Sequence, residues 1–114
     1  MEATYAQQAA LFKALAHPAR LCILELLACQ DEACVCHLTT VLRRRQPYVS
    51  QQLMILRRAG LVETREDGLM VYYRLRDGGV RELLAAAQAT LGLPRPEPVS
   101  PVVPGCTCPV CRSR

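Results

Sequence analysis

The stretch that decides the fold spans residues 46–61 and reads QPYVSQQLMILRRAGL. Val49, Leu53 and Leu56 recur at helical spacing, which leaves one face of the segment apolar and the other polar. Gly60 follows the last apolar position and suits the C-terminal cap of a helix, because glycine adopts the left-handed conformation without strain. The pattern therefore predicts an amphipathic helix that is capped at Gly60.

A shorter helix is predicted just upstream, from about Val35 to Leu42, where Leu38 and Leu42 lie four residues apart. The basic residues 43–45 form a tight connection between the two helices. Two short helices joined in this way are typical of a helix-turn-helix motif.

The period of the pattern changes after the glycine cap. Residues 61–65 (LVETR) and 70–75 (MVYYRL) are rich in β-branched and aromatic side chains, as strands are. Asp67-Gly68 lies between them and is a strong signal for a tight hairpin turn. These residues predict a β-wing next to the helix-turn-helix.

Three longer helices complete the predicted fold, over residues 3–15, from Pro18 to about residue 30, and over 77–93. Aromatic residues make up only 4% of the chain, so the core must consist of aliphatic side chains, which is typical of packed helices. We expect a mainly α domain with a small β-hairpin, a winged helix-turn-helix, over residues 1–93. A proline-rich flexible arm with a cysteine cluster follows over 94–114.

Length and charge limit the possible functions. A chain of 114 residues, 51% hydrophobic and 21% charged, holds one domain, which excludes a multidomain enzyme. Its net charge is +4, and residues 43–76 carry eight basic side chains against three acidic ones. A basic block of this kind either faces solvent or contacts polyanions. No apolar run approaches the roughly 20 residues of a membrane span, and the first residues lack the order of a signal peptide, so we expect a cytoplasmic protein.

The chain contains seven cysteines, a high and odd number for its length. Secreted disulfide scaffolds have this density, but cytosolic thiols stay mostly reduced. The cysteines are therefore interpreted as metal ligands, redox sensors or small core residues.

Five motifs follow one another along the chain: LFKALAHPARL at 11–21, CVCHL at 34–38, VSQQL at 49–53, LRRAGLV at 56–62 and VYYRL at 71–75. In this order they resemble the ArsR/SmtB family of metal-responsive bacterial repressors. The resemblance implies a homodimer that is paired through the first and last helices, reads a palindromic operator and is released by an inducer. The alanine and leucine stripes of those helices also offer more apolar surface than one small core can cover, which independently predicts a dimer.

In this fold the helix at 46–60 is the recognition helix, and its N-terminal end meets base edges. Gln52 occupies a position where the family often has histidine, which alters the possible base contacts. Arginines would contact phosphates, and the hairpin would reach the adjacent minor groove. The expected DNA contacts are Arg43, Arg44, Arg45, Tyr48, Ser50, Gln51, Gln52, Arg57 and Arg65.

Cys34 and Cys36 match the start of the third-helix metal site in thiolate-using members of the family. Two positions apart in an ideal helix, side chains diverge by about 200°, so both can hold one ion only in a frayed segment or in the first turn of the helix. Arsenic-sensing members have a third cysteine where this chain has Thr39, so a ligand is missing. The arm can span roughly 40 Å at about 3.1 Å per residue. The expected metal ligands are Cys34, Cys36, Cys106, Cys108 and Cys111.

Thiolate ligands favour soft inducers, namely Cd(II), Pb(II), Zn(II) or As(III). The family's other common site, built from Asp and His on the last helix, is not supported, because that helix lacks histidine. His37 is a further candidate donor, and the arm cysteines alone could form an independent site or a disulfide. Cys22 is interpreted as a core residue and His17 as a structural turn residue, while the role of Cys29 stays open.

Three other functions compete with an ion-released repressor. A repressor of the same fold could sense oxidants or reactive sulfur through a disulfide switch at Cys34 and Cys36. A thiol oxidoreductase using the CPVC motif at 108–111 lacks the βαβ context that such a motif needs, so we expect no enzyme. A winged-helix module that binds protein instead of DNA is the last alternative.

Overall fold

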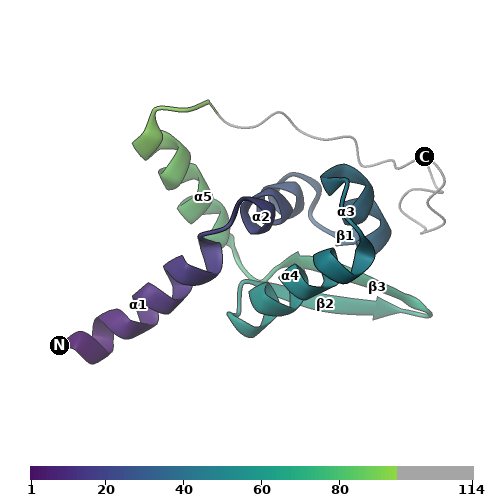
Figure 1. Cartoon of the computed structure of the whole chain (residues 1–114), viewed down its shortest axis with the longest axis horizontal. Helices are drawn as coiled ribbons and strands as arrows, with labels where there is room; N and C mark the ends of the chain where they lie inside the picture. The colour runs from purple at the N-terminus through teal and green to yellow at the C-terminus, as the bar shows by residue number, and fades with distance from the viewer. Residues whose placement is uncertain (95–114) are drawn as a thin grey trace.

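Eight elements follow one another in residues 1–94, the range that the structure, a computed structural model, describes. They are α1 (Glu2–Leu15), α2 (Pro18–Gln30), β1 (Ala33–Cys34), α3 (Val35–Leu42), α4 (Gln46–Arg58), β2 (Val62–Asp67), β3 (Met70–Leu75) and α5 (Gly78–Leu91). This is the predicted winged helix-turn-helix. Figure 1 shows α1 and α5 projecting on the side of the domain opposite the tip of the β2–β3 hairpin.

The predicted glycine cap of α4 is confirmed. Gly60 has φ of +77°, and its N–H donates to the carbonyl of Arg57 at 3.0 Å. The N–H of Leu61 donates to the carbonyl of Leu56, also at 3.0 Å, which completes a Schellman motif. A Cβ at position 60 would lie 2.8 Å from Nη1 of Arg76, the flexible end of a side chain that can move away, so glycine is favoured by the backbone conformation. The cap turns the chain directly from α4 into the wing.

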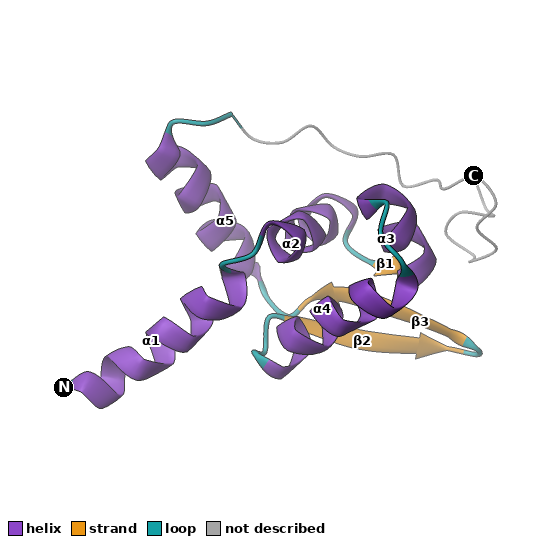
Figure 2. Cartoon of the chain, in the orientation of Figure 1, coloured by secondary structure: helices purple, strands orange, loops and turns teal. Residues whose placement is uncertain are grey.

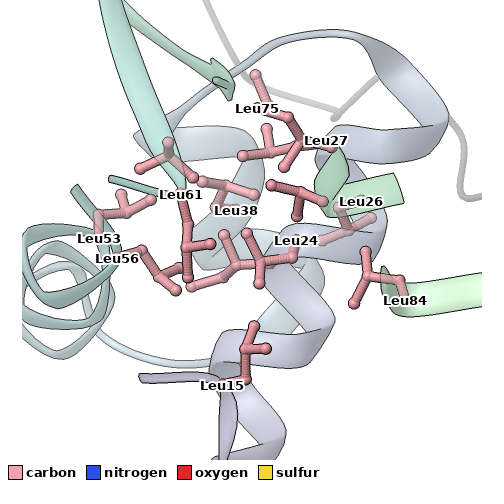
Figure 3. Packing of buried hydrophobic residues seen from close by; sticks show 14 of the residues in the cluster. Leu15, Leu24, Leu26, Leu27, Leu38, Leu53, Leu56, Leu61, Leu75 and Leu84 are labelled. Atoms are coloured by element: carbon pink, nitrogen blue, oxygen red, sulfur yellow. The ribbon is translucent and has the colours of Figure 1, made fainter. Parts of the chain in front are cut away.

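The core lies between α2, α3, α4 and the start of the wing. Leu24, Leu27, Leu38, Leu53 and Leu56 are fully buried, and Figure 3 shows their side chains converging from the three helices. This packing confirms the predicted apolar face of α4. It fixes α3 and α4 relative to each other and thereby sets the angle of the helix-turn-helix.

The outer helices bury few of their apolar residues. In α1 only Ala14 and Leu15 are buried, while Tyr5 and Phe12 remain 57% and 55% exposed. In α5 the side chain of Leu91 is 70% exposed. Both helices therefore carry apolar surface that one copy of the chain does not cover.

The wing differs from the sequence prediction in its turn. Asp67 pairs with Met70, so the two-residue loop consists of Gly68 and Leu69 and not of Asp67-Gly68. Gly68 has φ of +62° and Leu69 does not have a positive φ, which fits a type II′ turn with glycine at the first loop position.

A third strand, β1, was not predicted. It pairs antiparallel with β3, so the sheet of strands in Figure 2 has the order β1-β3-β2. The register places Ala33 opposite Tyr73 and Cys34 opposite Tyr72. The segment that leads into α3 is thus part of the same sheet as the wing. No helix within residues 1–94 has the length and apolar content needed to cross a membrane.

Candidate nucleic-acid interface and thiol pair

The turn between α3 and α4 presents three exposed arginines. Arg43 caps α3 in the left-handed conformation, with φ of +55°, and Arg45 is the extended N-cap of α4. A non-glycine residue at positive φ is uncommon and makes the connection sharp. The turn therefore places Arg43, Arg44 and Arg45 together in solvent next to the N-terminus of α4.

The ring of Tyr48 packs against Arg44 of this turn. The guanidinium of Arg44 lies 3.9 Å from the centroid of the Tyr48 ring, and the ring of His17 lies 6.5 Å from the same centroid. The Tyr48 side chain is only partly exposed and packs against the core. It is thus placed to orient Arg44, whereas the sequence predicted a contact with a base edge.

His17 confirms its predicted structural role. It is the N-cap of α2, and its Nδ1 accepts a hydrogen bond from the N–H of Ala19 at 3.1 Å. This bond satisfies one of the unpaired N–H groups at the start of the helix.

The solvent face of α4 contains Gln51, Met54, Arg57 and Arg58, with Ser50 partly exposed at its edge. Gln52 does not belong to this face, because only 7% of it is exposed and its Oε1 has no hydrogen-bond partner in the described part of the chain. Its predicted role as a DNA contact is corrected. Position 52 follows Val49 by three residues and falls on the buried side of the helix.

The wing arginine is held on the sheet. Arg65 donates two hydrogen bonds to Glu32, from Nη2 to Oε1 at 2.6 Å and from Nε to Oε2 at 3.1 Å. Its guanidinium also lies 4.6 Å from the centroid of the Tyr72 ring. The bond to Arg65 lowers the pKa of the Glu32 carboxyl. Arg65 is therefore engaged within the domain, in contrast to the predicted contact in the minor groove.

Cys34 and Cys36 lie where β1 becomes α3. Cys34 is the N-cap of α3, with an extended backbone at φ −85° and ψ 165°, and Cys36 is the second residue of the helix. The change of backbone conformation between them brings their Sγ atoms to 2.7 Å. Of the two arrangements that would let both sulfurs approach one point, a frayed segment or the first turn of the helix, the structure has the second. Cys34 is buried, whereas Cys36 is exposed and disulfide-bonded in this structure. Reduction of Cys36 is therefore needed before both sulfurs can act as thiolates.

A third ligand does not lie beside this pair within residues 1–94, where no group of three His, Cys, Asp or Glu side chains could hold one ion. The hydroxyl of Thr39 donates to the carbonyl of Cys36 at 2.8 Å, so it is used within α3. His37 is buried, and burial lowers its pKa, but it does not form such a group with the two cysteines. Cys106, Cys108 and Cys111 lie outside the described residues.

The prediction that Cys22 packs in the core is wrong, because its side chain is exposed on α2, as is that of Cys29. The apolar residues of α2 that pack inward start at Ile23 and Leu24. Although the side chain reaches solvent, neighbouring atoms remove part of the hydration of the Cys22 thiol. This loss of hydration and, to a lesser extent, the negative charge of Glu25 raise the pKa of the thiol, which disfavours the reactive thiolate.

Two residues of this region were missed by the sequence analysis. Glu32 and Tyr72 carry no motif of their own, and their contacts with Arg65 arise only when the sheet forms. Two acidic residues in a row before the cysteines, Asp31-Glu32, were the only local signal.

An exposed basic turn, a polar helix face and a β-hairpin beside it define a winged helix-turn-helix DNA-binding protein. The family model described as bacterial regulatory protein, arsR family, matches residues 17–64. The chain belongs to the ArsR family of transcriptional regulators, whose members are not enzymes.

Similar proteins support this assignment. Over 94 residues the chain is 43% identical to the biofilm growth-associated repressor of Agrobacterium fabrum, covering 82% of this chain and 80% of that one. It is 48% identical over 65 residues to the arsenical resistance operon repressor of Escherichia coli, covering 57% and 56% of the two chains. Among solved structures, a homodimeric winged helix-turn-helix DNA-binding domain of Mycobacterium bovis, a possible ArsR-family regulator, has a TM-score of 0.73 and 36% identity and covers 80% and 83%. The chain is an ArsR-family transcriptional repressor.

Proposed function

We propose that this repressor binds a palindromic operator as a homodimer and is released by a soft thiophilic ion, Cd(II), Pb(II), Zn(II) or As(III), held by cysteine thiolates. The observation that carries the proposal is the position of the Cys34 and Cys36 sulfurs, 2.7 Å apart at the start of α3. Zinc, for example, binds a thiolate sulfur at about 2.3 Å, so one ion can bridge the two sulfurs once Cys36 is reduced and the sulfurs move apart. The arm cysteines Cys106, Cys108 and Cys111 are the proposed additional ligands.

Titration of the fully reduced protein with Cd(II) and, separately, with arsenite tests this proposal. Thiolate-to-metal charge-transfer absorption counts the bound thiolates, and fluorescence anisotropy of an operator duplex selected from random DNA measures release. We expect saturable absorption and loss of operator binding at the same ion concentration. Release without thiolate absorption would contradict a thiolate-bound inducer.

The short distance between the two sulfurs also favours a second candidate, a disulfide or polysulfide switch at Cys34 and Cys36. The two candidates differ in their reagents. An oxidant or persulfide donor releases the operator in this alternative, and the reduced protein ignores Cd(II) and arsenite.

Dimerisation is the first prediction. The exposed Tyr5 and Phe12 of α1 and Leu91 of α5 supply the apolar surface that a second copy would cover. Light scattering at micromolar concentration should give twice the chain mass, and Phe12→Glu should give a single chain. Leu69→Glu at the wing tip, where the side chain is fully exposed, is the control and should remain dimeric. A monomeric wild-type protein would overturn the model of paired copies.

The second prediction concerns the DNA interface. Gln51→Ala should reduce discrimination between the selected operator and its mutated forms by about 1–3 kcal/mol, because glutamine reads a base edge. Arg44→Ala should weaken binding to all sequences and reduce the salt slope by about one, because arginine neutralises a phosphate. Anisotropy titrations at several salt concentrations measure both. Losses of the same size with unchanged salt slope in the two variants would exclude this docking.

A further inference from the structure

A row of three side chains crosses the sheet from the thiol pair to the wing. Cys34 of β1 lies opposite Tyr72 of β3, and Tyr72 lies opposite Arg65 of β2. Residues directly opposite each other in antiparallel strands point to the same face, so the three side chains are neighbours on one side of the sheet. Tyr72 is only 1% exposed, so its ring has little room to move independently of Cys34 and Arg65.

Glu32 links the two ends of this row, because it lies close to Cys34 in the sequence and pairs with Arg65. Glu32 precedes Cys34 by two positions, and both of its carboxylate oxygens accept from Arg65. A two-bonded pair between arginine and carboxylate fixes orientation as well as distance. The chain segment that carries the thiols is thus tied to the middle of β2 both through the Tyr72 ring and through the Glu32 carboxylate.

The same segment is also tied to α5, but less firmly. Arg81 donates to the Asp31 carboxylate at 3.2 Å and to the carbonyl of Ala28 at 3.3 Å. The Asp31 side chain is 93% exposed, against 24% for that of Glu32, so solvent screens the Asp31 pair more. Asp31 itself has φ of +69°, a strained conformation for a residue with a side chain. The Glu32–Arg65 pair is therefore stronger than the Asp31–Arg81 pair. A displacement of Cys34 is expected to move the wing more than α5.

We propose that Glu32 and Arg65 are positioning residues that transmit the state of the Cys34–Cys36 pair to the wing. In the protein with Cys36 reduced, an ion bound to both sulfurs would move them apart and shift the start of α3. This shift would break the two hydrogen bonds between Glu32 and Arg65 and change the angle of the β2–β3 hairpin relative to α4. The proposal rests on the proposed thiol-bound inducer and names how its binding reaches the DNA interface.

Glu32→Gln tests whether Glu32 and Arg65 couple the cysteine pair to the wing. The substitution keeps the shape of the side chain and removes the negative charge that holds Arg65. The ratio of operator affinities without and with Cd(II) should fall at least fivefold in Glu32→Gln, while the charge-transfer absorption of bound Cd(II) is retained. Glu63→Gln is the matched control, because Glu63 forms an ion pair with Arg74 on the same face of the wing, at 2.9 Å. The charge of Arg74 acts on Glu32 less than Arg65 does, so this control tests the wing charge without removing the main tie. This control should respond to Cd(II) as the wild-type protein does. An unchanged ratio in Glu32→Gln overturns the proposal.

A measurement without any inducer separates this proposal from the proposed function. Because coupling between two sites is reciprocal, releasing the wing must also change the thiols. Alkylation of Cys34 by iodoacetamide in the reduced protein, followed by mass spectrometry, should be several-fold faster in Glu32→Gln and in Arg65→Lys than in the wild-type protein and Glu63→Gln. Equal rates in all four proteins overturn the coupling. Faster alkylation in a protein that ignores Cd(II) keeps the coupling and rejects the proposed inducer.

Discussion

Replacing Leu53 by alanine is expected to lower the free energy of unfolding by about 2–5 kcal/mol. Leu53 is fully buried in α4, at the contact with α3 that sets the helix-turn-helix angle. A domain of this size has a total stability of about 5–15 kcal/mol, so the substitution removes a large part of it. Urea denaturation of the reduced protein, followed by circular dichroism at one fixed protein concentration, measures the loss.

Met54→Ala is the control for this prediction. It removes a side chain of similar size from the adjacent position of the same helix, but Met54 is 50% exposed. Its effect should stay within about 0.5 kcal/mol. A loss at Met54 as large as that at Leu53 would mean that α4 buries a different face.

The sequence was sufficient for the elements whose signals are local. The predicted bounds of α3, Val35 to Leu42, coincide with the observed helix, and the cap at Gly60 lies where the pattern places it. Apolar spacing, glycine caps and hairpin turns involve residues a few positions apart, so a pattern along the chain contains them. The same reasoning stated the condition under which Cys34 and Cys36 could approach each other, and the observed start of α3 between them meets it.

Contacts between residues that are far apart in the sequence could not be predicted from such patterns. β1 has two residues, too few to show a period, and it is a strand only because β3 pairs with it. Arg65 was assigned to DNA by its charge and its place in the wing, whereas its partner Glu32 is 33 residues away in the sequence. Because Arg65 pairs with Glu32 within the domain, its role is to hold the wing on the sheet.

The errors in α2 and α4 have a different origin. Leu21, Leu24 and Leu27 recur at helical spacing, which predicts one buried stripe on α2, yet Leu21 is 40% exposed, while Ile23 and Leu26 are buried. Apolar residues occur around most of this helix, so spacing alone does not select the inward face. Gln52 is polar but falls on a buried face, and polarity suggested the opposite position. In both helices the neighbouring elements determine which face is covered.

Replacing Cys34 and Cys36 together by serine is expected to abolish release by the inducer. If the wild-type protein couples ion and operator binding with a free energy of about 1–3 kcal/mol, the ion weakens operator binding 5- to 150-fold, and the double variant should show no change. Serine keeps the size of the side chain but does not supply a soft thiolate ligand. Operator binding without the ion should persist, because neither residue lies on α4. Anisotropy titrations of the operator duplex with and without Cd(II) or arsenite provide the measurement.

Deleting the chain after Leu93 distinguishes the contributions of the two groups of cysteines. The truncated protein retains α1 to α5 and should bind the operator with unchanged affinity, whereas its response to soft ions should weaken, because the proposed ligands Cys106, Cys108 and Cys111 are lost. Cys22→Ser is the matched control. Its side chain is exposed on α2 and its raised thiol pKa disfavours the thiolate, so no change is expected. A truncated protein that responds to every ion as the full chain does would leave Cys34 and Cys36 as a site that needs no thiol from the arm. In that case the ion must take its remaining ligands from solvent or from residues 1–93, and Thr39, whose hydroxyl now donates to the carbonyl of Cys36, would have to turn away from it to contribute.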